Sequence, residues 1–204
     1  MEAVLDLVSL ADSEQGQKQG QKQSQKQRTG VSALHELRLV DVGTGSGAIA
    51  LALATELPSA EIHATDISSD ALDVARANAA RLELASRVDF HITDLLSGFA
   101  SGSFDIVVSN PPYVGDSEEE SVQLEVRKFE PRNAVFAGLT GLEVIERLIP
   151  QAHTALRPGG WLVFEISGTI VDRVRGLLSS WDEVTIRNDL QGIARVAIAK
   201  KSDP

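Results

Sequence analysis

Cysteine is absent from this chain of 204 residues, and its absence excludes disulfide bonds, zinc–thiolate sites and a thiol nucleophile. Positive charge is scarce as well, because 19 lysines and arginines stand against 29 acidic residues and leave a formal net charge of −10. Proteins that follow the phosphates of nucleic acids favour basic surfaces. The charge balance therefore argues against a nucleic-acid partner.

Signals for export or membrane insertion are also missing. The first ten residues carry Glu2 and Asp6 and no basic residue, so they do not read as a signal peptide. The most apolar stretch, Val42 to Thr55, is rich in glycine and too short to span a bilayer. We therefore expect a cytoplasmic protein without a membrane partner.

Composition divides the chain into three segments. Residues 1–11 are interpreted as the remnant of a short N-terminal helix, and residues 12–30 are a low-complexity run of Gln, Lys, Gly and Ser. Such a run cannot bury enough apolar surface to offset the entropy of ordering it, so we interpret it as a linker that is disordered. Residues 31–204 are long enough for one folded domain.

Apolar strands alternate with helices from residue 37 onward. Strands are predicted at 37–42, 61–65, 88–92, 104–109, 161–166, 183–187 and 194–199, and helices at 48–56, 69–84, 141–156 and 170–179. The last two strands are typical of a closing antiparallel pair. The alternation predicts an α/β fold, with a mostly parallel seven-stranded sheet and helices on both faces.

A glycine-rich turn follows the first predicted strand, with the spacing G-x-G-x-G in residues 43–47. Glycine allows unusual backbone angles and lets the backbone approach a ligand closely. The next strand ends at Asp66, where an acidic side chain in this topology meets ribose hydroxyls. A purely structural turn, with Asp66 placed at a helix N-terminus, is the alternative. The glycine turn and Asp66 occur together at the ends of two successive strands, and this combination favours nucleoside binding over a purely structural turn.

The third strand leads to Asp94, which could accept a hydrogen bond from an adenine amino group while Leu95 packs on the ring. Taken alone, Asp94 is almost as well explained as a turn or capping residue. The glycine turn, Asp66 and Asp94 together end three consecutive strands. They would form one continuous nucleoside cleft.

The fourth strand ends at the tetrad Asn110-Pro111-Pro112-Tyr113. Two prolines have no N–H to donate and cannot continue a strand ladder. In an open parallel sheet, ligands bind at the carboxyl ends of the strands. An amide, a rigid turn and an aromatic ring at that place are suited to holding a flat polar group.

These residues resemble the class I S-adenosylmethionine-dependent methyltransferases. Residues 41–47 are similar to the first motif of that family, and the tetrad resembles its branch that acts on adenine N6, cytosine N4 and glutamine N5. Phe129 to Gly138, followed by Gly141-Leu142-Glu143, resembles the HemK-type (PrmC-type) protein-(glutamine-N5) methyltransferases. Those enzymes modify the glutamine of the Gly-Gly-Gln motif in class I peptide chain release factors.

The resemblance implies a Rossmann-like catalytic domain over residues 31–204 that uses S-adenosyl-L-methionine, releases S-adenosyl-L-homocysteine and has a release factor as partner. It implies a cofactor site that consists of Asp41, Gly43, Thr44, Gly45, Ser46, Gly47, Asp66, Ile67, Asp94, Leu95 and Asn110. It also implies a catalytic, substrate-holding tetrad of Asn110, Pro111, Pro112 and Tyr113, with Arg132 as a further substrate contact. No metal is expected, because the sulfonium is already activated.

The chain departs from this family in three places. Such enzymes usually begin with a helical domain of several dozen residues, whereas here only a few residues and the Gln/Lys-rich run precede the predicted core. Position 95 is leucine, where some relatives carry an aromatic residue. Glu165 to Gly168 match the family's usual acid-and-glycine strand ending only loosely. His63 and His91 lie within apolar strands and are interpreted as core or edge residues rather than as ligands.

Two other functions share parts of this pattern. An adenine-N6 methyltransferase acting on DNA or RNA has the same tetrad, but would be expected to show a basic face or a target-recognition insertion. A non-catalytic S-adenosylmethionine-binding module would keep the nucleoside cleft, yet it has no need of the Asn110 amide.

Overall fold

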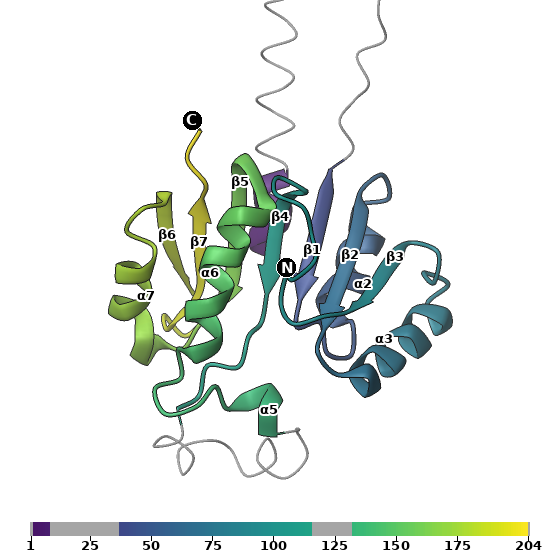
Figure 1. Ribbon diagram of the computed structural model, residues 1–204, viewed down its shortest axis with the longest axis horizontal. Coiled ribbons are helices and arrows are strands. Elements are labelled where there is room, and N and C mark those ends of the chain that lie inside the picture. Colours follow the sequence, from purple (N-terminus) through teal and green to yellow (C-terminus); the bar gives the residue numbers. More distant parts are fainter. Residues whose placement is uncertain (1, 9–36, 116–131, 204) are drawn as a thin grey trace, which may run out of the picture.

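The computed structural model describes residues 2–8, 37–115 and 132–203. Its core is a seven-stranded sheet with the order β3-β2-β1-β4-β5-β7-β6 (Figure 1). The strands are β1 (Arg38–Val42), β2 (Glu61–Asp66), β3 (Val88–Ile92), β4 (Phe104–Ser109), β5 (Leu156–Glu165), β6 (Asp182–Asn188) and β7 (Ala194–Lys200). The first five pair in parallel, and β7 runs antiparallel to both β5 and β6. The predicted fold class is confirmed.

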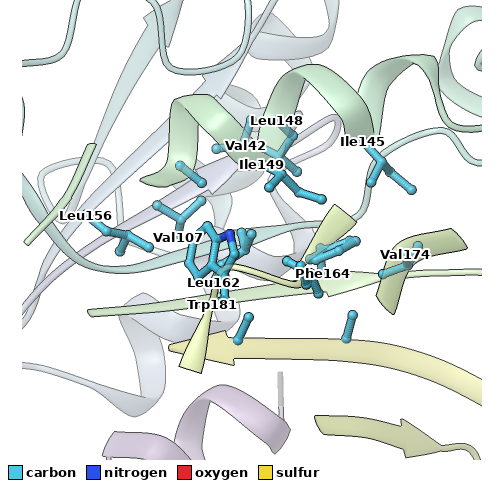
Figure 2. Close-up of a cluster of buried hydrophobic side chains, with 14 of the residues drawn as sticks. Val42, Val107, Ile145, Leu148, Ile149, Leu156, Leu162, Phe164, Val174 and Trp181 are labelled. Atoms are coloured by element: carbon cyan, nitrogen blue, oxygen red, sulfur yellow. The ribbon is translucent and has the colours of Figure 1, made fainter. Parts of the chain in front are cut away.

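Helices cover both faces of the sheet because successive strand side chains point to opposite sides. On one face, α2 (Ala48–Glu56) and α3 (Ser69–Arg81) pack in a cluster that includes Leu39 and Ile106. On the other, α6 (Glu143–Ala155) and α7 (Val171–Leu177) pack against the next residues along the same strands, Val40 and Val107. Figure 2 shows part of this second cluster, with Leu148 and Ile149 of α6 near Phe164 of β5 and Trp181.

The strand β5 begins earlier than the sequence pattern predicts. The helix before it ends at Ala155, as Pro158 and two glycines suggested, but pairing with β4 already starts at Leu156. Between the pairs Phe104–Leu156 and Ile106–Trp161 the register shifts, so the extra residues form a bulge. A Cβ at Gly160 would lie 2.9 Å from the carbonyl oxygen of Asp105, so only glycine fits this close approach.

Residues 2–8 are helical and pack on the α2 and α3 face of the sheet through Ala3, Val4 and Leu7. Asp6 accepts a hydrogen bond from Arg187 of β6 at 2.6 Å. The predicted linker at 12–30 lies outside the described residues, and the domain boundaries stay a prediction. Among the helices that the structure describes, none is long and apolar enough to cross a membrane.

Leu148→Ala is expected to lower the free energy of unfolding by about 2–5 kcal/mol, because Leu148 is fully buried and truncation leaves a cavity. The matched control is Leu82→Ala, since Leu82 is 54% exposed and should cost under about 1 kcal/mol. Denaturant unfolding of both variants measures the difference. Equal losses would contradict the assignment of Leu148 to the core.

Candidate functional site

The site lies at the carboxyl edge of the parallel strands, where four strand ends stand side by side. Val42 of β1 pairs with Thr65 of β2 and with Ser109 of β4, and Ser109 pairs with Phe164 of β5. The Ser109 hydroxyl also donates to the Val42 carbonyl oxygen at 2.7 Å, which joins β4 to β1 at this level. The next residues along the chain are Gly43 after β1, Asn110 after β4, and Asp66 and Glu165, which are the last residues of β2 and β5.

The glycine loop, residues 43–47, turns tightly between β1 and α2. Gly43, Gly45 and Gly47 have φ of 69°, 57° and 85°, in the left-handed region that glycine adopts without strain. The Thr44 N–H donates to the Thr65 carbonyl oxygen at 2.9 Å, so the loop folds back over the end of β2. Because Thr44 is buried, the loop presents glycine backbone and the exposed Ser46 at the edge of the sheet.

Asp66 connects this loop to the start of α3. One of its carboxylate oxygens accepts from the Gly45 N–H and the other from the Ser68 N–H, both at 2.9 Å. The next residue, Ile67, is 66% exposed and offers an apolar surface beside the carboxylate. The structure thus brings together the glycine loop and Asp66, which the sequence placed in one cleft.

Asp41 lies beneath the glycine loop and is 1% exposed. One carboxylate oxygen accepts from the Thr44 hydroxyl at 2.6 Å and from the Ala50 N–H at 3.1 Å. The other, Oδ1, is buried and has no hydrogen-bond partner among the described residues. Burial raises the pKa of Asp41 to about 6, although both hydrogen bonds lower it. An unpaired buried carboxylate oxygen favours a cationic or N–H-donating ligand at this point.

Asp94 follows β3 and forms an ion pair with Arg147 of α6. Sequence reasoning did not identify Arg147, because 53 residues separate the two partners. Leu95 is half-buried and adopts a φ of 53°, an uncommon left-handed conformation for a residue with a Cβ. A role for Asp94 and Leu95 in adenine binding stays a prediction.

The tetrad interrupts the strand as its prolines require. Ser109 is the last residue of β4, Pro111 is buried, and Asn110 is exposed at the edge of the sheet. Among the residues that the structure describes, none forms a hydrogen bond with the Asn110 amide. The amide is therefore available to a ligand at the position where sequence reasoning expected it.

The backbone of the tetrad is held by the segment before α6. Val114 pairs with Phe136 in an isolated parallel bridge, next to α5 (Arg132–Val135). Its N–H donates to the Val135 carbonyl oxygen at 3.2 Å, and its own carbonyl accepts from the Ala137 N–H at 3.0 Å. In Figure 1 the chain leaves β4 at the lower edge of the sheet, and α5 lies below that edge. Part of the family-like segment, Phe129 to Gly138, thus supports the loop that carries the tetrad.

Gly141 completes this support. It has a φ of 76°, and a Cβ at this position would lie 2.5 Å from the Tyr113 carbonyl oxygen. Two residues later, the Glu143 carboxylate accepts from the Thr140 N–H at 2.9 Å, an arrangement that resembles a capping box and starts α6. Arg132 is the first residue of α5, and its contact with substrate stays a prediction.

The side chain of Tyr113 is held by a separate contact with the end of β5. It is half-buried, and its hydroxyl donates to a carboxylate oxygen of Glu165 at 2.9 Å. Burial and the nearby negative charge of Glu165 raise the pKa of Tyr113 to about 12. Sequence reasoning noted Glu165 only as a loose family match, because no local pattern links it to a residue 52 positions away.

A second polar cluster has residue types that suit a metal, but several of its donor atoms already form hydrogen bonds with other side chains. Donor atoms of Glu61, His63 and Asp89 lie within 4.8 Å of one another. Arg38 already donates to both oxygens of Glu61, at 2.9 and 3.0 Å. The buried His63 ring pairs with Glu61 at 2.8 Å and with His91 at 3.0 Å. Both histidines are hydrogen-bonded to other side chains, and their interpretation as core or edge residues rather than ligands stays a prediction.

Comparison with known proteins finds similarity to methyltransferases. A family model described as "Methyltransferase small domain" matches residues 28–128. The chain is 48% identical over 164 residues to a release factor glutamine methyltransferase of Koribacter versatilis, covering 80% of this chain and 58% of the relative. It is 42% identical over 172 residues to the protein of that name from Chlorobaculum tepidum, covering 82% and 58%.

The chain is a homologue of the release factor glutamine methyltransferases. The match to a methyltransferase model implies S-adenosylmethionine as the methyl donor. The chain spans 58% of the length of each of these two relatives, so the match concerns only a part of those proteins.

Solved structures agree on the fold. A ribosomal protein L11 methylase from Lactobacillus delbrueckii superposes with a TM-score of 0.60 at 24% identity, covering 84% of this chain and 73% of the other. An S-adenosylmethionine-dependent O-methyltransferase from Thermotoga maritima gives 0.61 at 16% identity, covering 82% and 60%. These likenesses place the chain in the class I methyltransferase fold.

Gly141→Ala is expected to destabilise the protein by about 1–3 kcal/mol, because the added methyl meets the Tyr113 carbonyl and the φ is unfavourable. Gly176→Ala is the control, since that glycine lies in α7 with no atom within 4 Å of the added Cβ. It should stabilise by up to about 1 kcal/mol. Unfolding curves decide, and unchanged stability of Gly141→Ala would contradict the close contact.

Proposed function

We propose that this chain carries the catalytic domain of a protein-(glutamine-N5) methyltransferase that modifies the Gly-Gly-Gln glutamine of class I peptide chain release factors. The observation that carries the proposal is the exposed Asn110 amide, which directly follows β4, the strand that pairs with β1 beside its glycine loop. The relatives named as release factor glutamine methyltransferases support the choice of substrate.

The residues present fit S-adenosylmethionine. The unpaired Oδ1 of Asp41 suits the ammonium group of its methionine part, and the glycine loop allows close approach of the ligand. Asp66 suits the ribose hydroxyls, and the exposed Ile67 suits a face of the base. When bound, S-adenosylmethionine supplies a methyl group on a positively charged sulfur, which leaves with the electron pair of the broken bond.

The tetrad would prepare the substrate nitrogen, which receives the methyl and releases one proton to solvent. A primary amide nitrogen is a weak nucleophile because its lone pair is delocalised into the carbonyl. The Asn110 side-chain oxygen and the Pro111 backbone carbonyl would accept its two N–H bonds, and Tyr113 would pack on the flat amide. Because the prolines restrict the loop, less entropy is lost in reaching a reactive geometry.

Features of the same edge favour a protein substrate over a nucleic acid. Leu139 and Leu190 are 79% and 108% exposed. Leu139 lies between the bridge at Phe136 and the contact of Gly141 with Tyr113, and Leu190 lies in the turn between β6 and β7. Together with the net charge of −10, these apolar side chains suit a protein surface better than a phosphate backbone.

Asn110→Ala is expected to lower methyl transfer by about 100-fold or more while cofactor binding changes little, because the amide acts on the substrate nitrogen. The assay supplies methyl-labelled S-adenosylmethionine with a release factor, the same factor with its Gly-Gly-Gln glutamine changed, and duplex DNA. Label should enter only the release factor whose Gly-Gly-Gln glutamine is intact. The exposed Asn188 gives a matched control, Asn188→Ala, which should keep wild-type activity.

Each other outcome of this assay has a distinct meaning. Label in DNA alone would identify the adenine-N6 methyltransferase instead. Cofactor binding without transfer to any acceptor would identify a binding module. Full activity of Asn110→Ala would overturn the proposed role of that amide.

Affinity for S-adenosylmethionine is expected to decrease as the pH is lowered through the pKa of Asp41, which is about 6. The bound ammonium favours the carboxylate, so below this pKa binding must displace a proton. Affinity should be constant above about pH 7 and about tenfold lower near pH 5. Calorimetry in buffers of different ionisation enthalpy should detect the proton release. Asp41→Asn should flatten this profile, whereas Asp182→Asn, at an exposed position of β6, should not. A flat wild-type profile would contradict the assignment.

A further inference from the structure

The phenol of Tyr113 is anchored to a different strand from the one that carries it. Tyr113 follows β4, whereas its hydrogen-bond acceptor Glu165 is the last residue of β5. Because Ser109 pairs with Phe164, Asn110 and Glu165 follow at the same level of two adjacent strands. The Pro-Pro turn therefore carries the tyrosine ring out from β4 and back over the end of β5.

Arg195, near the start of β7, lies next to this pair. Its carbonyl oxygen accepts from the Ile166 N–H at 2.9 Å, which places it beside the end of β5. Its positive charge interacts with both the Tyr113 phenol and the Glu165 carboxylate. The cation thus interacts with both partners of the hydrogen bond that the Tyr113 hydroxyl donates to Glu165.

A tight turn fixes the orientation of Arg195 in its turn. The Arg195 Nε donates to Asp189 at 3.1 Å. The other oxygen of Asp189 accepts from the N–H groups of Gln191 and Ile193, both at 2.9 Å. The hydrogen bond from Arg195 to Asp189 raises the pKa of Arg195, so the guanidinium stays charged. Three side chains from three parts of the chain thereby hold one aromatic ring.

We propose that Glu165 and Arg195 are positioning residues, which act through the Tyr113 hydroxyl to fix the ring that forms one wall of the amide site. The backbone of Tyr113 is held separately, by the Val114 bridge and by Gly141. A ring fixed at both ends restricts the amide plane before the substrate arrives, and this pre-organisation accelerates transfer. The inference rests on the proposed glutamine methyltransferase function.

The kinetic test compares two replacements of Glu165 with methyl transfer to a release factor. Glu165→Leu removes the acceptor and should lower kcat about tenfold with the affinity for S-adenosylmethionine unchanged. Glu165→Gln keeps an acceptor oxygen and should restore kcat to within about threefold of wild type. The control Glu183→Gln removes a carboxylate that pairs with Lys200 at the far end of β7, and should have no effect on kcat.

Coupling to the hydroxyl distinguishes positioning from a merely structural role. Tyr113→Phe should lower kcat about as much as Glu165→Leu, and the double variant should be no slower than the slower single variant. Arg195→Gln should fall between wild type and Glu165→Leu. If Glu165→Leu and Tyr113→Phe multiply their effects, or if Glu165→Gln is as slow as Glu165→Leu, the proposal is wrong.

A second readout does not depend on activity. Tyr113 is the single tyrosine of the chain, so phenolate absorbance reports this residue alone. Its pKa, about 12 in the wild type, should fall in Glu165→Gln, because one of the causes that raise it is removed. Circular dichroism at each pH shows that the chain is still folded. An unchanged pKa in the folded variant would overturn the contact itself.

The two readouts separate the inference from the proposed function. A wild-type chain that transfers no methyl to the release factor overturns the function, and the positioning role falls with it, even where the titration confirms the Glu165–Tyr113 pair. An active wild type with an unchanged Tyr113 pKa in Glu165→Gln overturns only the inference.

Discussion

The in-register parallel pairing of β2, β1, β4 and β5 is the constraint on which the rest of the structure depends. It brings four strand ends to one level, so that the glycine loop, Asp66, Asn110 and Glu165 share one edge although they lie far apart in the sequence. Small polar contacts maintain this alignment. The Ser109 hydroxyl connects β4 to β1, and Asp66 connects the loop after β1 to the end of β2.

The two halves of this edge are organised by opposite means. On the side proposed to hold the cofactor, Asp41 lies buried beneath the glycine loop, and its Oδ1 has no hydrogen-bond partner among the described residues. On the side proposed to hold the substrate, Tyr113 is restrained by backbone contacts at one end and by Glu165 at the other. Asn110 stands between the two halves as an exposed amide. This division suits a reaction that must orient a weak nucleophile beside an already activated donor.

Much of the fold could be predicted from the sequence. Helix and strand periodicity located all seven strands to within a few residues, except that β5 starts five residues early, at Leu156 rather than Trp161. That error has a physical cause, because pairing with β4 continues through a bulge that Gly160 makes possible. The glycine loop, Asp66 and Asn110 were located because each follows directly on an apolar strand. Arg147, Arg195 and the link from Tyr113 to Glu165 could not be found, since their partners lie on other elements and leave no local pattern.

The sequence by itself determined which residues end the strands and which chemistry they carry, because strand termination by glycine and proline is a local effect of backbone geometry. The family-like segment likewise pointed to a glutamine acceptor. Only the tertiary structure decided which groups hold the reactive edge. Within the described part of the chain, Asp41 is left with an unpaired oxygen, Asp94 is paired with Arg147, and the Tyr113 hydroxyl donates to Glu165 of β5. These outcomes depend on burial and on strand register, which arise from contacts between residues distant along the chain.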